Sequence, residues 1–276
     1  MFDRRIKNAE IFKDTMEWID NYVGLSDAVK NSINKQRMYP EAEKIEIEKN
    51  SNRNCRTIIS TKRSFEAAES YAKEGKKVCV LNFASATNPG GGVKNGSSAQ
   101  EEALCRCSTL YSCLDIKSNW KCFYLPHRED GDPLYNDDLI YTPEVLVVKS
   151  DVSFPEKLPE REWYKVDVVT CAAPNLRSVP SNRMNPMAGG KAASITLDGL
   201  YVLQKKRIDK IFRVAIANGA DVLVLGAFGC GAFCNPPEVV AKAFYDIQKN
   251  YEKYFDVVEY AIFCTERERK KFETKR

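Results

Sequence analysis

The stretch of sequence that decides the fold is residues 78–111, VCVLNFASATNPGGGVKNGSSAQEEALCRCSTLY. It opens with the apolar run Val78 to Phe83, which is typical of a strand buried on both faces of a parallel sheet. A turn-rich segment follows and ends in the glycines Gly90, Gly91 and Gly92. Gln100-Glu101-Glu102 then begins a segment whose apolar residues recur with helical spacing. The stretch therefore predicts a strand, a glycine-rich turn and a helix with an acidic first turn.

This order of elements predicts a binding site for an anionic sugar. Glycine has no Cβ, so its backbone can approach a ligand closely and can adopt a positive φ. The free N–H groups at a helix N-terminus favour an anionic group such as a phosphate. Two adjacent carboxyl groups at the same place supply a hydrogen-bond acceptor and a proton carrier. We therefore expect a phosphate-bearing sugar to lie against an acid here.

The two glutamates, Glu101 and Glu102, are suited to different roles. Neighbouring residues on a helix point about 100° apart, so their carboxyl groups cannot flank one bond as the pair in an ordinary glycosidase does. The alternative is that the acidic pair only stabilises the first turn of the helix. The glycines before the helix, and a second glycine-rich segment, favour the functional interpretation.

That second segment is residues 225–237, LGAFGCGAFCNPP, which joins a predicted strand to a predicted helix. Its glycines predict a loop whose N–H groups could surround a diphosphate, although the spacing is neither that of a P-loop nor that of a dinucleotide fold. Taken alone, the segment is equally consistent with a tight strand-to-helix turn. Phe228 and Phe233 are expected either to pack on a ribose or to close the pocket, unless one of them belongs to the core.

Apolar patterning along the rest of the chain predicts strands that alternate with helices, which indicates a largely parallel sheet with helices on both faces. Such sheets bind ligands at the carboxyl ends of their strands. The N-terminal residues 1–50 are expected to form a helical extension, and residues 51–276 the catalytic domain. Helices are expected at 61–74, 195–218, 236–248 and from Glu266 onward; strands at 43–47, 145–148, 166–172, 222–225 and 257–263; and long loops at 126–143 and 174–194.

Composition indicates a globular protein of the cytoplasm. The chain has 276 residues, 43% of them hydrophobic, and a net charge of +4, which is too small to argue for nucleic-acid binding. We find no apolar run of membrane-spanning length and no signal-peptide pattern at the start. Ten cysteines are scattered through apolar contexts, which is typical of reduced, buried thiols. No CxxC pair is present and there is one histidine, so we expect neither a metal site nor a cofactor.

The glycine triplet, its spacer Val93 to Ala99 and the Gln100-Glu101-Glu102 triplet together resemble the signature of poly(ADP-ribose) glycohydrolases of the bacterial or microbial type. The segments LNFASATNPGGG, CRCSTLY, AAPN (172–175) and LGAFGCGAFCNPP are also similar to that family. The resemblance extends from about residue 55 to residue 264. It implies a macrodomain-like α/β/α sandwich with a mixed, mostly parallel sheet. It also implies an enzyme that hydrolyses the ribose–ribose O-glycosidic bond of poly(ADP-ribose), acting mainly from the chain end, and releases ADP-ribose.

The resemblance also implies roles for individual residues. Glu102 is expected to be the catalytic acid, and Glu101 to hold the ribose hydroxyls at the cleaved bond. Phe228 is expected near the distal ribose, and Phe263 in the position whose ring stacks on adenine. The remaining residues expected to contact ADP-ribose are Asn88, Gly90, Gly91, Gly92, Gln100, Gly226, Ala227, Gly229, Cys230, Gly231, Ala232 and Phe233.

The proposed chemistry requires Glu102 to be protonated before it gives its proton to the leaving oxygen. A helix N-terminus favours the ionised form, whereas burial, Glu101 and the ligand diphosphate favour the protonated one. We expect the protonated form to prevail only with substrate bound. Two alternatives stay open: a mono-ADP-ribosyl hydrolase acting on another ADP-ribosylated substrate, and a macrodomain that binds ADP-ribose without cleaving it. Cys107 and Cys230 are expected near the site, either as oxidisable thiols or as small buried residues.

Overall fold

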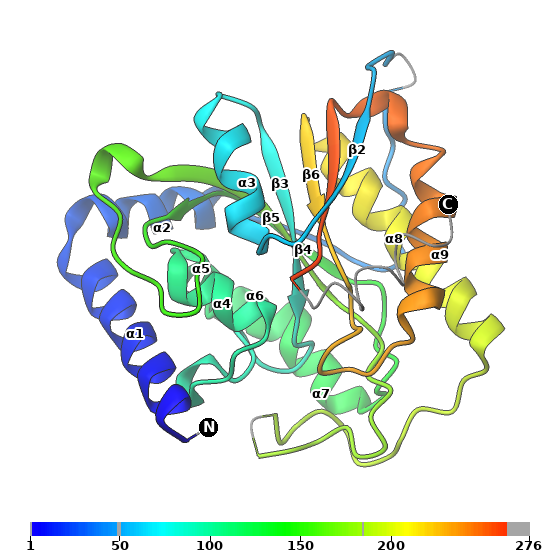
Figure 1. Cartoon of the computed structure of the whole chain (residues 1–276). Helices are drawn as coiled ribbons and strands as arrows, with labels where there is room; N and C mark the ends of the chain where they lie inside the picture. Colours follow the sequence, from blue (N-terminus) through cyan, green and yellow to red (C-terminus); the bar gives the residue numbers. More distant parts are fainter. Residues whose placement is uncertain (1, 49–50, 184, 264–276) are drawn as a thin grey trace.

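A mixed seven-stranded sheet forms the centre of the computed structural model, which describes residues 2–48, 51–183 and 185–263 (Figure 1). The strand order is β1-β4-β5-β3-β6-β7-β2. Strands β5, β3, β6, β7 and β2 are mutually parallel, and β4 runs antiparallel to both of its neighbours. The strands are β1 (Arg37–Tyr39), β2 (Arg56–Ser60), β3 (Val78–Ala84), β4 (Leu139–Val147), β5 (Tyr164–Ala172), β6 (Val222–Leu225) and β7 (Val257–Ala261).

Helices cover both faces of this sheet, as the sequence predicts for buried parallel strands (Figure 1). Side chains of β3 alternate between the faces: Val80 joins a core with Leu104 of α4, whereas Leu81 joins a core with Phe212 of α8. The helices are α1 (Phe2–Asn21), α2 (Val23–Lys35), α3 (Ser64–Lys73), α4 (Gln100–Cys107), α5 (Leu110–Leu114), α6 (Lys117–Asn119), α7 (Leu125–Asp130), α8 (Leu197–Ala217) and α9 (Pro237–Gln248). The expected α/β/α architecture is confirmed.

The topology brings the two glycine-rich segments to the same edge of the sheet. Strand β3 pairs in parallel with β6, and Val80 lies opposite Val224. The glycine triplet follows β3, and the segment beginning at Gly226 follows β6. Because neighbouring parallel strands end at the same edge, both turns lie at the carboxyl ends of the central strands, where such sheets bind ligands.

The N-terminal segment packs directly on the helix that carries the acidic pair. Asn8 of α1 donates a 3.2 Å hydrogen bond to the Gly96 carbonyl, and the Thr15 hydroxyl donates a 2.7 Å bond to the Arg106 carbonyl of α4. The Phe12 ring meets the edge of Tyr111 at a centroid distance of 4.9 Å. The segment is not purely helical, because β1 adds an edge strand to the sheet. The domain boundary at residue 50 stays a prediction.

Other elements differ from the sequence expectation. Residues 43–48 form no strand, and their apolar alternation reflects Ile45 packing into the core beside α8. The edge strand β2 was not predicted, since its side chains are only partly buried and it lacks a strong apolar pattern. The expected loop at 126–143 contains most of α7 and the start of β4. The helix expected from Glu266 lies outside the described residues.

No helix in the described part of the chain combines the length and apolarity required to cross a membrane.

Candidate active site

The glycine triplet folds around the carboxyl groups of the acidic pair. Gly90 and Gly91 both have positive φ, +65° and +56°. A Cβ on Gly91 would lie 2.7 Å from Oε1 of Glu102 and 3.1 Å from Oε2 of Glu101, whereas a Cβ on Gly90 would lie 2.7 Å from the Tyr111 ring. These positions therefore need glycine both for their backbone conformation and for space.

Glu102 is held by one oxygen and has the other free. Its Oε1 accepts a 2.9 Å hydrogen bond from the Gly92 backbone N–H. Its Oε2 is buried and has no hydrogen-bond partner among the described residues. An unpartnered buried oxygen is costly in a fold and is a common sign of a catalytic or ligand-binding role. The arrangement fixes the carboxyl group and presents one oxygen for chemistry.

Glu101 is anchored to the end of β3 by both oxygens. Its Oε2 accepts a 2.7 Å hydrogen bond from the Ser85 backbone N–H, and its Oε1 a 3.3 Å bond from the side chain of Asn82. Each carboxylate oxygen can accept a further hydrogen bond, so the group can still hold a sugar hydroxyl. The two carboxyl groups thus occupy different positions, as their adjacent places on α4 predict.

Burial controls the protonation of both acids. Burial raises the pKa of Glu102, and the hydrogen bond from the Gly92 N–H only partly opposes this effect. Burial, followed by the neighbouring charge of Glu102, raises the pKa of Glu101 well above its ordinary value. Both shifts are present in the protein alone. The upward shift of the Glu102 pKa is therefore present without substrate, and the expectation that the protonated form prevails only with substrate bound stays a prediction.

Asn88 is oriented by residues that sequence reasoning did not identify. The Arg128 guanidinium donates to the Asn88 side-chain oxygen and stacks 4.6 Å above the Trp120 ring. The Asn88 amide in turn donates a 2.5 Å hydrogen bond to Asn185, which comes from the long loop between β5 and α8. Neither contact can be recognised from the sequence around Asn88, since Arg128 lies 40 residues and Asn185 97 residues away along the chain.

The second glycine-rich segment is fixed by close packing. A Cβ on Gly226 would lie 2.6 Å from the Ala261 carbonyl oxygen, and a Cβ on Gly229, whose φ is +75°, would lie 2.6 Å from the Ala173 Cβ. Asn235 closes the segment by donating a 3.1 Å hydrogen bond to the Gly229 carbonyl. The turn is therefore preformed and has this conformation without a bound ligand.

The two phenylalanines of this segment have different environments. Phe233 lines the pocket described below, as expected. Phe228 does not: its side chain is fully buried and its ring meets Phe83 edge-on at 5.9 Å. The expected contact between the Phe228 ring and a ribose is corrected accordingly, because the ring supports the turn from within the core.

A pocket of about 290 Å³ lies between the first turn of α4 and the second glycine-rich segment. Seven of the residues expected to contact ligand line it: Gln100, Ala227, Gly229, Gly231, Ala232, Phe233 and Phe263. The two glutamates, Asn88, Gly90, Gly91, Gly92, Gly226, Phe228 and Cys230 are not among the lining residues. The acid centre therefore lies beside this pocket, on other faces of α4.

Gln100 lines the pocket, but its side-chain amide forms hydrogen bonds with the protein backbone. Its side-chain oxygen accepts a 2.9 Å hydrogen bond from the Phe83 N–H, and its nitrogen donates a 2.8 Å bond to the Leu81 carbonyl. These bonds tie the start of α4 to the end of β3. The residue consequently fixes the position of the acidic pair.

Phe263 lies at the pocket rim, just beyond β7, and its side chain is 63% exposed. The Arg63 guanidinium covers one face of its ring at 3.9 Å. The expected stacking on adenine stays a prediction, and the exposed ring is available for it.

The two cysteines expected near the site are unsuited to thiol chemistry, and the described residues offer no metal centre. Cys107 is fully buried, and burial raises the pKa of the partly buried Cys230 to about 12. Both thiols therefore stay protonated and poorly reactive at neutral pH. Among the described residues, no group of three or more His, Cys, Asp or Glu side chains is arranged to hold a metal ion.

Known proteins share sequence and fold features with this chain. Residues 14–150 match the model of the catalytic domain of microbial-type PARG. The chain is similar to poly(ADP-ribose) glycohydrolase from Thermomonospora curvata bound to the inhibitor ADP-HPD, with 28% identity, a TM-score of 0.79, and 99% of this chain and 100% of that chain covered. No curated protein gives a significant match.

A second solved structure is the poly(ADP-ribose) glycohydrolase from Deinococcus radiodurans in complex with ADP-ribose. It is 26% identical with a TM-score of 0.71, and the similarity covers 89% of this chain and 94% of that chain. Together with the glycine triplet folded around a buried acidic pair, these similarities show that the chain belongs to the microbial-type poly(ADP-ribose) glycohydrolase family.

Proposed function

We propose that the protein hydrolyses the ribose–ribose O-glycosidic bond of poly(ADP-ribose) and releases ADP-ribose, with Glu102 as general acid and base. The observation that carries the proposal is the environment of Glu102. One of its oxygens is fixed by the Gly92 N–H, the other is buried without a partner, and burial raises the pKa of the carboxyl group. A protonated, oriented carboxyl group is what a general acid requires.

In the first step, Glu102 donates its proton to the bridging oxygen as the bond from that oxygen to the anomeric carbon breaks. The departing polymer leaves with a hydroxyl group, and an oxocarbenium-like ribose remains. The ionised Glu102 then accepts a proton from a water molecule, whose oxygen bonds to the anomeric carbon. The products are free ADP-ribose and the shortened chain, and Glu102 regains its starting protonation state.

The rest of the ligand follows from the position of this centre. We place the ribose next to the cleaved bond beside Gly91 and Glu101, where the glycine backbone approaches both carboxyl groups closely. The diphosphate then lies against the preformed turn at Gly229 and Gly231, and the adenosine occupies the pocket that ends at Phe263. Backbone N–H groups of such a turn suit a diphosphate.

The test is incubation of the purified protein with poly(ADP-ribose), followed by chromatography of the products. The wild type is expected to release ADP-ribose. Glu102→Gln is expected to lose about 10²- to 10⁴-fold in rate, the usual contribution of a general acid–base group, and to keep its affinity for ADP-ribose. Activity is expected to survive treatment with a chelator, since the proposed steps use only side chains and water.

Other outcomes would favour the alternatives. Tight ADP-ribose binding without turnover of any ADP-ribosylated substrate would identify a binding module. Release of ADP-ribose from a mono-ADP-ribosylated protein or nucleic acid, with the polymer left intact, would identify a mono-ADP-ribosyl hydrolase. Release of ADP-ribose by Glu102→Gln at the wild-type rate would overturn the assignment of the acid.

A further inference from the structure

Tyr135 lies between the two glycine-rich segments. Its ring is only 7% exposed and packs in a small cluster with Ala86, Ala172 and Phe233. Ala86 belongs to the turn that leads to the glycine triplet, and Phe233 belongs to the second glycine-rich segment. The ring centroids of Tyr135 and Phe233 are 6.2 Å apart. The Tyr135 side chain therefore contacts both the turn that carries the glycine triplet and the second glycine-rich segment. These two segments form the walls between which the proposed ligand lies.

The backbone of Tyr135 is in a conformation that this residue type rarely adopts. Its φ is +56°, in the left-handed region. For a non-glycine residue this conformation is strained and persists only where surrounding contacts impose it. Contacts of residues 134–138 must therefore hold Tyr135 in this conformation.

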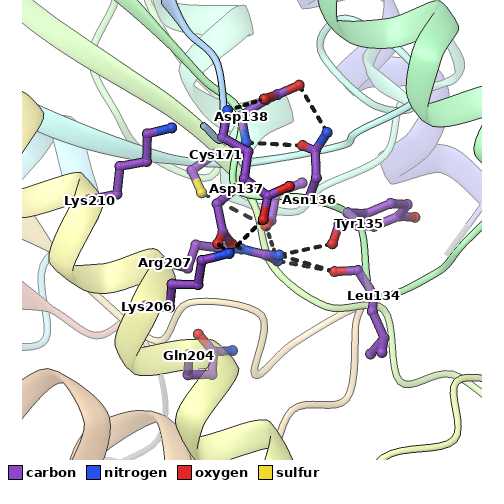
Figure 2. Close-up of polar contacts among 12 residues, drawn as sticks. Leu134, Tyr135, Asn136, Asp137, Asp138, Cys171, Gln204, Lys206, Arg207 and Lys210 are labelled. Atoms are coloured by element: carbon purple, nitrogen blue, oxygen red, sulfur yellow. Dashed lines mark hydrogen bonds and ion pairs between the residues drawn. The ribbon is translucent and has the colours of Figure 1, made fainter. Parts of the chain in front are cut away.

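Arg207 of α8 supplies those contacts (Figure 2). Its side chain is fully buried and donates to three backbone carbonyls: Ala172 at 2.8 Å, Leu134 at 3.2 Å and Tyr135 at 3.1 Å. Ala172 is the last residue of β5, so the guanidinium joins the turn to the end of a central strand. In Figure 2 the Tyr135 ring points away from Arg207, while its carbonyl faces the guanidinium.

Asp137 neutralises and orients the buried cation. Its Oδ1 accepts a 2.8 Å hydrogen bond from Nε of Arg207, and its Oδ2 lies 2.8 Å from the Lys206 ammonium (Figure 2). Burial by itself would raise the pKa of Asp137, but the charges of Arg207 and Lys206 hold it below its ordinary value. An ionised partner and three carbonyls use the donors of the guanidinium, a planar group that a lysine cannot replace.

We infer that Arg207 and Tyr135 are positioning residues, which set the spacing between the two glycine-rich walls of the ADP-ribose site. Arg207 imposes the left-handed turn, and the turn places the Tyr135 ring between Ala86 and Phe233. Neither residue contacts the acidic pair, so the inference concerns binding of the ligand more than the chemical step. It rests on the proposed function for the identity of the ligand.

The main test removes the ring and keeps the turn. Glycine adopts a positive φ without cost, so Tyr135→Gly removes the ring between Ala86 and Phe233 while preserving the backbone conformation of the turn. We expect the dissociation constant for ADP-ribose, and KM for the polymer, to rise about tenfold or more, because binding must then order the two segments that the ring holds in place. The kcat at saturating polymer should stay close to wild type, and Tyr135→Phe should restore the affinity.

A matched control deletes an equally buried ring elsewhere. Tyr251 is 4% exposed and stacks on Phe212 in the core beside α8. Tyr251→Ala should lower the melting temperature and leave KM unchanged. Arg207→Lys, measured below its melting temperature, should raise KM as Tyr135→Gly does.

Two results would overturn the inference. One is an unchanged KM and ADP-ribose affinity in Tyr135→Gly; the other is a rise in KM that Tyr251→Ala reproduces. Failure of the proposed function is distinguishable from both, because the wild type itself would then neither bind ADP-ribose nor release it from the polymer.

Discussion

The backbone N–H of Gly92 donates a 2.9 Å hydrogen bond to Oε1 of Glu102 across ten residues of sequence. This bond joins the glycine triplet to the first turn of α4 and leaves the second oxygen of Glu102 free. The geometry of the catalytic acid therefore depends on the shape of the glycine turn, which connects a local backbone property to the proposed chemistry.

Gly91→Ala should cause a large loss of kcat and only a small loss of stability. Its Cβ would lie 2.7 Å from Oε1 of Glu102 and displace the carboxyl group that delivers the proton. A loss of about 10²-fold in kcat is expected from a displacement of about 1 Å. Gly219→Ala is the matched control, since its φ is also positive and no atom lies within 4 Å of the added Cβ. Equal loss of activity in both variants would contradict the prediction.

The rate of the first step should fall as pH rises through the pKa of Glu102. The general acid works in its protonated form, and burial raises the pKa of Glu102. The decline of kcat/KM with rising pH should therefore have its midpoint above about pH 4.3, the ordinary pKa of glutamate. The melting temperature, measured over the same pH range, separates this effect from unfolding. A midpoint at the ordinary value would show that Glu102 is not the titrating acid.

Glu101→Gln should stabilise the protein more as pH rises. The folded protein raises the pKa of Glu101 by burial, so it binds the proton more tightly than the unfolded chain does. The associated stability is present below the unfolded pKa of about 4.3 and is lost as pH rises through the folded pKa. Glutamine has no proton to lose, so the difference in melting temperature between the variant and the wild type should increase with pH. A constant difference would contradict the assigned cause.

Gly96→Ala should displace α1 from the rest of the protein. A Cβ there would lie 1.9 Å from the backbone carbonyl oxygen of Arg5, and the φ of Gly96 is +73°. We expect a loss of unfolding free energy of about 2 kcal/mol or more from the combined clash and backbone strain. Denaturant titration measures it, and Gly75→Ala, with a similar φ and open space around its Cβ, provides the control. Equal losses in the two variants would mean that α1 adjusts without cost.

Phe263→Ala should weaken ADP-ribose binding if the ring stacks on adenine. Stacking of a base on an aromatic side chain contributes about 1–3 kcal/mol, and Phe263→Tyr should preserve it. Calorimetric titration with ADP-ribose measures the change. Val23→Ala removes a comparably exposed apolar side chain from α2 and should have no effect. An unchanged affinity in Phe263→Ala would place the adenine elsewhere.

The main elements of the fold could be read from local patterns. Strand β3, helix α4, strand β6 and helix α9 follow the predicted segments closely, because continuous apolar runs and helical spacing report burial directly. The short edge strands β1 and β2 were missed. Strand β1 has only three residues, and the side chains of β2 are only partly buried. What places both strands in the sheet is backbone pairing with β4 and β7, which leaves little trace in the choice of residues.

The candidate site likewise contains some residues that could be predicted from the sequence and others that could not. Motifs identified the acidic pair and both glycine-rich segments, since each needs particular residues close together in the sequence. The burial of Phe228, in contrast, involves packing against Phe83 of strand β3, which is distant in the sequence. Arg128, Asn185 and Tyr135 carry no motif at all, because their roles arise from contacts with residues far away along the chain.

By itself the sequence determined the order of the elements, the position of the acids at the start of a helix, and the glycines that allow a positive φ beside them. These features follow from covalent geometry and local periodicity. Only the tertiary structure decided which oxygen of Glu102 is free, in which direction the pKa of Glu102 shifts, and how Arg207 holds Tyr135 between the two walls. Desolvation and hydrogen bonds to distant carbonyls depend on the packed environment, which no local stretch of sequence contains.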